Sequence, residues 1–140
     1  MRILLLLLGV FLVYTSCAKT EDAIFNETSQ KWLLVKMTTS FVNSETTGKD
    51  MAWQESLIFN TDGTFIKSRT IEGAEKEAFG TYVKKDNTDY SYLELEYTSG
   101  SELKASCGQS ETLSIIGGNL LVGSWNICDG PRLEYKQSNK

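Results

Sequence analysis

"YSYLELEY", residues 90–97, alternates polar and apolar side chains with a period of two. Leu93, Leu95 and Tyr97 fall on one face of an extended chain, and the glutamates between them fall on the other. This alternation is typical of a β-strand that has one face in the protein core and the other in water. The stretch therefore predicts a half-buried strand.

The stretches on both sides of residues 90–97 repeat this pattern, and turn residues separate them. "MAWQESLIF" (51–59) places Trp53, Leu57 and Phe59 on one face. "NTDG" (60–63) then turns the chain, because Asp-Gly favours a tight hairpin. No stretch after Gln30 carries a helical stripe. Strands are predicted at 32–41, 51–59, 64–71, 79–85, 90–97, 102–107, 111–116, 120–127 and 132–137, with a charged loop before 79.

These strands predict an all-β fold, an antiparallel up-and-down meander of about eight or nine strands. A meander of this size can remove its exposed edges by closing into a small barrel. The interior of such a barrel holds only side chains or one small ligand. The side chains expected in the core are Trp32, Leu57, Phe59, Phe65, Leu93, Leu95 and Tyr97.

The first residues have the features of an export signal. Met1-Arg2 is a short basic end, and residues 3–13 are apolar apart from Gly9. About a dozen residues cannot cross the roughly 30 Å of bilayer hydrocarbon, which needs about 20 helical residues. They match the core of a signal peptide instead. A buried N-terminal helix is the alternative, although the run has no polar face for water.

Tyr14-Thr15-Ser16-Cys17 resembles the lipobox of bacterial lipoproteins, with a small residue directly before a cysteine. The resemblance implies that residues 1–16 are removed as a signal peptide and that Cys17 carries fatty acids such as palmitate. Residues 17–30 would then be a lipidated tether to a domain at 31–140. Two or more acyl chains hold a protein stably on a membrane. Cleavage nearby by ordinary signal peptidase, which would release a soluble protein, is the alternative.

An acidic pair follows the cysteine. Glu21-Asp22 resembles the export signals that send some Gram-negative lipoproteins to the cell surface. Two solvated charges in a flexible segment are the alternative interpretation. We therefore expect a lipid-anchored protein of the cell envelope, at the outer membrane and with surface exposure as an option.

The chain has three cysteines, and an odd cysteine in an exported protein must be accounted for. With Cys17 acylated, Cys107 and Cys128 remain as one pair in a compartment where disulfides persist. Up-down-up strand order brings both to the same rim, although two strand spacings of about 10 Å exceed the reach of a bridge within the sheet. Gly108 and Asp129-Gly130-Pro131 let the loops bend inward. The sequence predicts a Cys107–Cys128 disulfide.

The composition argues against several kinds of chemistry. The chain has no histidine, which excludes His-based triads and His-ligated metals. A formal net charge of −4 without a basic cluster argues against nucleic-acid binding. Glu94 and Glu96 lie about 7 Å apart along one strand face, a spacing that could suit glycoside hydrolysis. Because that face is predicted to meet water, we expect no enzyme activity, and no cofactor or metal.

Several stretches resemble the small lipocalin-like (calycin-type) lipoproteins of Gram-negative bacteria. They are "KWLLV", "LIFNTDGTF", "GTYV", "YLELEY" and "CDGPRLEYKQ", and the resemblance covers roughly residues 30–136. Trp32 occupies the place of the tryptophan in the lipocalin Gly-x-Trp motif, with Gln30 where that motif has glycine. The resemblance implies a lipocalin-like barrel that binds a small apolar or amphipathic molecule.

Glu55 is the charged residue of most interest, because alternation puts it on the inward face of its strand with Trp53 and Leu57. A charge inside a barrel costs several kcal/mol unless it is paired or wet. One interpretation is a polar anchor near the mouth of a ligand cavity, with Trp53 as its wall. A β-bulge or a solvent-reached mouth position is the alternative. Tyr92 and Trp125 are further candidate ligand contacts, or else packing residues.

Three functions remain open at this point. The first is small-ligand binding by an envelope lipoprotein, which a cavity in the barrel would favour. The second is a protein-interaction module such as an inhibitor of a lysozyme-type hydrolase, which a solid core with a conspicuous loop carrying charged groups would favour. The third is a structural accessory subunit of an outer-membrane complex, which a long exposed edge or apolar patch would favour. We expect the first.

Overall fold

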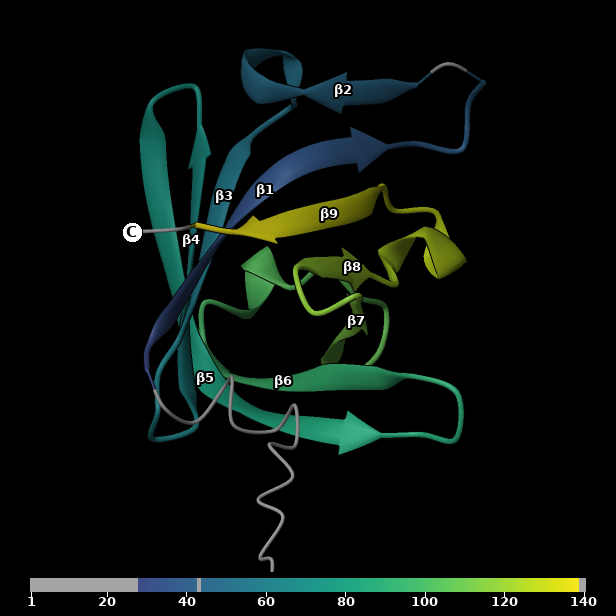
Figure 1. Cartoon of the computed structure of the whole chain (residues 1–140). Helices are drawn as coiled ribbons and strands as arrows, with labels where there is room; N and C mark the ends of the chain where they lie inside the picture. The colour runs from purple at the N-terminus through teal and green to yellow at the C-terminus, as the bar shows by residue number, and fades with distance from the viewer. Residues whose placement is uncertain (1–27, 43, 139–140) are drawn as a thin grey trace, which may run out of the picture.

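The computed structural model of the chain describes residues 28–42 and 44–138. Nine antiparallel strands and three short 3-10 helices make up this part (Figure 1). The strands are β1 (Gln30–Thr38), β2 (Glu45–Thr47), β3 (Gln54–Phe59), β4 (Thr64–Ile71), β5 (Ala74–Asp86), β6 (Ser91–Ser99), β7 (Glu111–Ile116), β8 (Leu120–Gly123) and β9 (Arg132–Gln137). The 3-10 helices are η1 (Gly48–Asp50), η2 (Ser101–Leu103) and η3 (Trp125–Cys128).

The sheet closes on itself. Its strand order is β2-β1-β3-β4-β5-β6-β7-β8-β9, and β1 also pairs with β9, from Trp32 opposite Gln137 to Thr38 opposite Arg132. Figure 1 shows β1 and β9 running side by side at this closure. Eight strands therefore form a closed antiparallel barrel, and the short β2 adds to one end of β1. The predicted all-β, lipocalin-like barrel is confirmed.

Connections alternate between the two ends of the barrel, as they must in an antiparallel meander. One end carries the connections 39–53, 72–73, 100–110 and 124–131. We call it the bridged end, because the Cys107–Cys128 disulfide joins two of these connections. The opposite end, which we call the hairpin end, carries the turns after β3, β5 and β7, together with the start of β1 and the end of β9.

Period-two alternation fills the interior. Each barrel strand turns every second side chain inward, and twelve large side chains are less than 2 % exposed. The apolar ones among them lie along most of the barrel and include six of the seven predicted core residues. Tyr97, the seventh, is only partly buried and packs against this core. The fully buried set is Trp32, Leu57, Phe59, Phe65, Lys67, Leu93, Leu95, Glu111, Leu113, Leu121, Leu133 and Tyr135.

Five predicted elements differ in the structure, and two of them are strands with other bounds: the one predicted at 32–41 ends at Thr38, and the one predicted at 51–59 begins at Gln54. Residues 102–107 form no strand, because η2 and an irregular segment carry the chain from β6 to β7. β8 ends at Gly123, and Trp125 and Ile127 belong to η3 instead. β5 begins at Ala74 rather than near residue 79, since Glu72 and Gly73 both have positive φ and make a two-residue hairpin turn there.

Within residues 28–42 and 44–138, none of the helices has the length and apolar character that crossing a bilayer requires. The predicted signal peptide (1–16), the lipid attachment at Cys17 and nearly all of the tether lie outside the described residues. The described domain begins close to the predicted boundary, with β1 starting at Gln30.

Candidate functional site

A cluster of charged side chains occupies the half of the barrel interior nearer the bridged end. Glu55, near the start of β3, faces Arg69 of β4 directly across the sheet. Arg69 Nε donates to Glu55 Oε2 at 2.5 Å, and Tyr135 Oη donates to Glu55 Oε1 at 2.6 Å. Glu55 is 5 % exposed and points inward. The alternation that predicted this orientation is correct, and no bulge turns the carboxylate to solvent.

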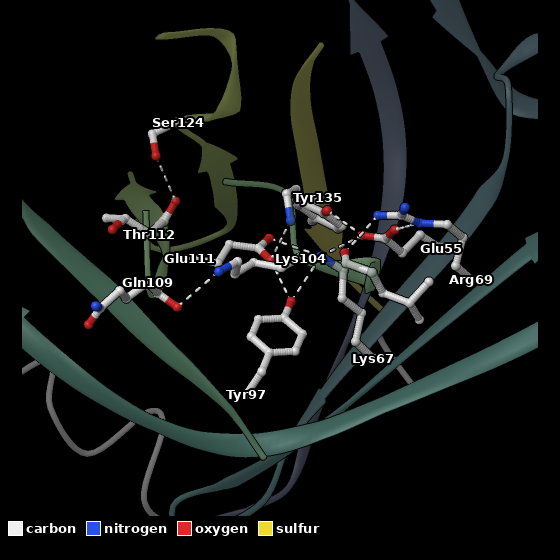
Figure 2. A network of polar contacts seen from close by, with 12 residues as sticks. Glu55, Lys67, Arg69, Tyr97, Lys104, Gln109, Glu111, Thr112, Ser124 and Tyr135 are labelled. Atoms are coloured by element: carbon white, nitrogen blue, oxygen red, sulfur yellow. Dashed lines mark hydrogen bonds and ion pairs between the residues drawn. The ribbon is translucent and has the colours of Figure 1, made fainter. Parts of the chain in front are cut away.

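Lys67 links this pair to a second carboxylate. Its ammonium lies 3.2 Å from Glu55 Oε1 and 2.9 Å from both carboxylate oxygens of Glu111, the first residue of β7. The side chains of Lys67, Glu55 and Glu111 have no exposed surface. Figure 2 shows these groups converging from different strands inside the barrel. Together with Arg69, two cations balance two anions, which is the condition for burying charge at tolerable cost.

Two tyrosines complete the cluster, and both donate to carboxylates. Tyr97 Oη donates to Glu111 Oε2 and accepts from Lys67 Nζ at 3.3 Å (Figure 2). Burial, reinforced by the nearby carboxylates, raises the pKa of the Tyr97 phenol far above its usual range. The same causes raise the pKa of the Tyr135 phenol. Both hydroxyls therefore stay protonated and act as fixed donors.

Glu111 stays ionised, because its neighbours stabilise the charged form of its carboxyl group. Burial acts to raise the pKa of its carboxyl, but the Lys67 ammonium and the hydrogen bonds from Tyr97 and the Ala105 amide outweigh it. The pKa of Glu111 is therefore lowered from its ordinary value. A carboxylate with these donors is a structural anion rather than a proton-transfer group.

Two indoles lie where the cluster meets the bridged end. The guanidinium of Arg69 lies 4.6 Å from the ring centroid of Trp53, a cation–π distance. Trp53 and Trp125 pack with their ring centroids 6.4 Å apart. Trp53 precedes β3 and Trp125 lies in η3, so the connections of the bridged end bring them together. The Trp53 Nε1 is buried and has no hydrogen-bond partner among the described residues.

The connection between β6 and β7 covers the same end of the interior. Leu103 and Ala105 are 3 % and 0 % exposed. Arg69 Nη2 donates to the Leu103 carbonyl oxygen at 2.9 Å, and the Ala105 amide donates to Glu111 Oε2 at 3.0 Å. The charged cluster thus holds this segment by its backbone.

The predicted candidates do not all belong to one site. Trp53, Glu55 and Trp125 come together around Arg69. Tyr92 lies apart, on the outward face of β6, with its ring 5.8 Å from that of Tyr90. Period-two alternation turns it away from Leu93 and the interior, so the structure does not bring it together with the other candidates, and its role as a ligand contact stays a prediction.

The remaining candidates stand as follows. Glu94 lies on the outer face, where it pairs with Lys85 and accepts from Ser110 Oγ at 3.1 Å. Glu96 is exposed on the same face.

The Cα atoms of Cys107 and Cys128 are 6.3 Å apart and their sulfurs are bonded. The bridge joins the connections 100–110 and 124–131, which bend toward each other as predicted.

Sequence reasoning missed four members of the cluster: Lys67, Arg69, Glu111 and Tyr135. The same alternation that singled out Glu55 carries their signal. Lys67 and Arg69 follow Phe65 at period two, and Glu111 and Tyr135 are two residues from the inward Leu113 and Leu133. What the pattern does not give is the pairing, since Lys67 and Glu111 are 44 residues apart.

Side chains of the described residues occupy the barrel interior. A surface pocket of ≈ 410 Å³ lies beside the bridged end and is lined by the segment from Gly48 to Gln54 together with Thr70, Glu72 and Gly73. Another, of ≈ 470 Å³, lies at the hairpin end beside Gln30 and Gln137. Among the described residues, no group of three or more acidic or cysteine side chains is placed to hold a metal ion.

Comparison with protein-family models, with curated proteins and with solved structures finds no match for this chain.

Proposed function

We propose that this protein is a lipoprotein of the cell envelope, anchored through Cys17, whose filled barrel presents its bridged end to a protein partner. The observation that carries the proposal is the interior. Among the described residues, a charge-balanced cluster and large apolar side chains are buried there with almost no exposed surface, which supports a packed barrel over a hollow one that holds a ligand. Of the functions that the sequence leaves open, a protein-interaction module then fits best.

The bridged end supplies an apolar contact surface. Phe41 and Val42, in the connection after β1, are 82 % and 93 % exposed, and Ile127 in η3 is 82 % exposed. Thr38, the last residue of β1, pairs with Arg132, the first residue of β9. The connection that follows β1 and the connection that leads from η3 into β9 therefore start from neighbouring strand ends. Figure 1 shows the β1–β2 connection and η3 on the same side of the barrel. Large apolar side chains exposed on loops at one end of a barrel are typical of interaction sites, for a separate protein partner as well as for an accessory subunit of a larger complex.

Charge favours a protein with a basic rim over an anionic lipid surface. The four connections of the bridged end carry five acidic residues and two basic ones. The acidic residues are Glu45, Asp50, Glu72, Glu102 and Asp129, and the basic ones are Lys49 and Lys104. A protruding loop with an apolar tip suits a cleft, as in the inhibition of a lysozyme-type hydrolase.

Topology agrees with anchoring through Cys17. The chain enters β1 at the hairpin end, so this end is the one that a lipid on Cys17 would connect to the membrane. Mass spectrometry of the membrane fraction should find an acylated N-terminal Cys17. In a Cys17→Ser variant the barrel should fold and leave the membrane. A product that starts at another residue would overturn the anchor.

Site-specific photo-cross-linking in intact cells tests the interaction. Benzoylphenylalanine placed at position 41 or 127 should give adducts with the same protein, while the probe at the exposed Thr88 of the hairpin end should not. The purified partner should then bind the unmodified chain at least tenfold more tightly than a Phe41→Ser variant. Adducts of equal yield at 41 and 88, or equal binding by both proteins, would contradict the proposal.

A small amphipathic ligand at the rim is the second candidate. The ≈ 410 Å³ pocket is lined in part by Trp53, whose buried indole N–H has no hydrogen-bond partner among the described residues. This N–H is buried, so an acceptor group on a ligand would reach it only when the side chains that cover it move. Screening of small amphipathic compounds by Trp fluorescence should then find a signal that a Trp53→Phe variant loses and a Trp125→Phe variant keeps. Equal loss in both variants would place the ligand elsewhere.

A further inference from the structure

The segment from Leu103 to Ala105 lies at the bridged end of the barrel. Like a bound peptide, it has buried side chains and a backbone that is hydrogen-bonded by side chains of the barrel interior. Both residues are almost fully buried, although the segment belongs to no strand. Lys104 between them is extended, with φ −64° and ψ 124°. In an extended chain, the carbonyl of one residue and the amide of the residue two positions on point to the same side.

The charged cluster binds these two backbone groups. Arg69 donates to the Leu103 carbonyl at 2.9 Å, and Glu111 accepts from the Ala105 amide at 3.0 Å. A guanidinium and a carboxylate thus form charge-assisted hydrogen bonds with two backbone groups on one side of a tripeptide. Neither contact depends on the identity of the segment's side chains, so a peptide from another chain could make both.

The segment is fixed on both sides. Gly100, before it, has a φ of +66°, and a Cβ there would lie 2.5 Å from the Glu77 carbonyl oxygen. On the other side, Nζ of Lys104 within the segment donates to the Gly108 and Gln109 carbonyls that follow it, at 2.6 and 3.1 Å. Cys107 then ties the connection to Cys128. The disulfide is the one tie in this set that a chemical step can remove.

We propose that the bridged end of the barrel interior is a binding site for a short extended peptide, which the chain's own Leu103–Ala105 segment occupies while the Cys107–Cys128 disulfide is intact. The peptide has a leucine-sized residue followed two positions later by a small one. A dithiol reductant opens the site: its two thiols are oxidised to a disulfide, and Cys107 and Cys128 take up two electrons and two protons to become thiols. This site uses other residues than the interaction surface formed by Phe41, Val42 and Ile127, although Cys128 adjoins Ile127 in η3.

Hydrogen exchange of the full chain, with and without dithiothreitol, tests the opening. Amides of residues 101–106 should accelerate on reduction at least tenfold more than those of residues 54–59 in β3, which accelerate only by the loss of global stability that the broken disulfide causes. Unchanged exchange at 101–106 would contradict the proposal. So would equal acceleration in both regions, because the segment would then not leave independently of the barrel.

A peptide added in trans tests the site itself. The full chain carrying Leu103→Ser, Cys107→Ser and Cys128→Ser has a weakened internal occupant, and circular dichroism checks that it folds. The anisotropy of a fluorescein-labelled Glu-Leu-Lys-Ala-Ser peptide should rise as this variant is added. The half-maximal rise should need a variant concentration at least tenfold lower than for a labelled Glu-Asp-Lys-Ala-Ser peptide. The unmodified, oxidised protein should bind neither. Equal binding of the two peptides, or none by the folded variant, would overturn the proposal; if the variant does not fold, the exchange measurement decides.

Discussion

Lys67 Nζ lies 2.9 Å from both carboxylate oxygens of Glu111, in the interior of the barrel and 44 residues away along the chain. Neither side chain has exposed surface. The pair joins β4 to β7 across the interior, and through Glu55 and Arg69 it belongs to a cluster with two positive and two negative charges. A cluster of side chains with no net charge therefore fills the half of the barrel interior nearer the bridged end. The same cluster hydrogen-bonds the backbone of the β6–β7 connection, which covers that end.

Removing one member of the Lys67–Glu111 pair should destabilise the fold strongly. A Lys67→Met variant leaves Glu111 buried without its cation, and breaking a buried pair in this way costs about 3–5 kcal/mol. Urea unfolding measures the difference. The matched control is Lys85→Met, which removes a partly exposed lysine that pairs with Glu94 on the outer face and should leave the midpoint nearly unchanged.

A double variant separates pairing from packing. Lys67→Met combined with Glu111→Leu removes both charges, and replacing a buried pair by apolar residues is often neutral or stabilising. Part of the loss in Lys67→Met should therefore be recovered. If the double variant is as unstable as the sum of the two single variants, the pair is not coupled in the way that its geometry indicates.

Stability should depend on pH through Glu111. Its pKa is lower in the folded protein than in the unfolded chain, mainly because Lys67, Tyr97 and the Ala105 amide outweigh burial. The unfolded state then binds more protons, so the free energy of unfolding is highest above the unfolded pKa of about 4.3 and falls as pH drops toward the folded pKa. A Glu111→Gln variant should show a shallower acid slope. Asp62 and Glu94, whose pKa values are also lowered, act equally in both proteins.

Gly80 of β5 should tolerate no side chain. A Cβ at this position would lie 2.0 Å from the Glu96 carbonyl oxygen and 2.6 Å from Cε1 of Phe65. Gly80→Ala must therefore displace backbone, and overpacking of this kind typically costs about 1–3 kcal/mol or more. Gly123→Ala is the control, because its nearest contact would be an ordinary 3.7 Å. Equal unfolding midpoints for the two variants would show that the β5–β6 contact is looser than described.

The disulfide can be checked by counting thiols. Unfolded, unreduced protein should show no reactive thiol at Cys107 or Cys128, which are bonded and 21 positions apart. Closing a loop of this length stabilises by roughly 3 kcal/mol on the chain-entropy model. Reduction should therefore lower the melting temperature. Two reactive thiols at these positions, or an unchanged melting temperature, would contradict the assignment.

Much of the fold follows from local pattern. The predicted strands 64–71, 111–116 and 132–137 match β4, β7 and β9, because strict alternation and turn residues bound them on both sides. Residues 102–107 show the limit of the method. Leu103 and Ala105 alternate and are both buried, as a strand would have them, yet the segment covers the interior. Alternation reports burial, and it cannot say whether a neighbouring strand offers hydrogen bonds.

The site was less predictable than the fold. Alternation correctly turns Glu55 inward, but its neutralisation depends on Arg69, Lys67 and Tyr135, which lie 14, 12 and 80 positions away. Contacts at such separations follow from barrel closure and register. An inward charge can thus be recognised from sequence, whereas its partners cannot be.

The most direct test of the central claim, that the barrel interior is packed rather than hollow, is titration of the oxidised full chain with an apolar fluorescent probe such as N-phenyl-1-naphthylamine. A packed interior predicts no saturable one-to-one binding, and the same weak fluorescence from the unmodified protein and from a Trp53→Phe variant. A Leu95→Ala variant, which opens space in the core, should bind the probe if any variant does. Saturable one-to-one binding by the unmodified protein that the Trp53→Phe variant keeps would contradict the claim and restore the hollow, ligand-binding barrel.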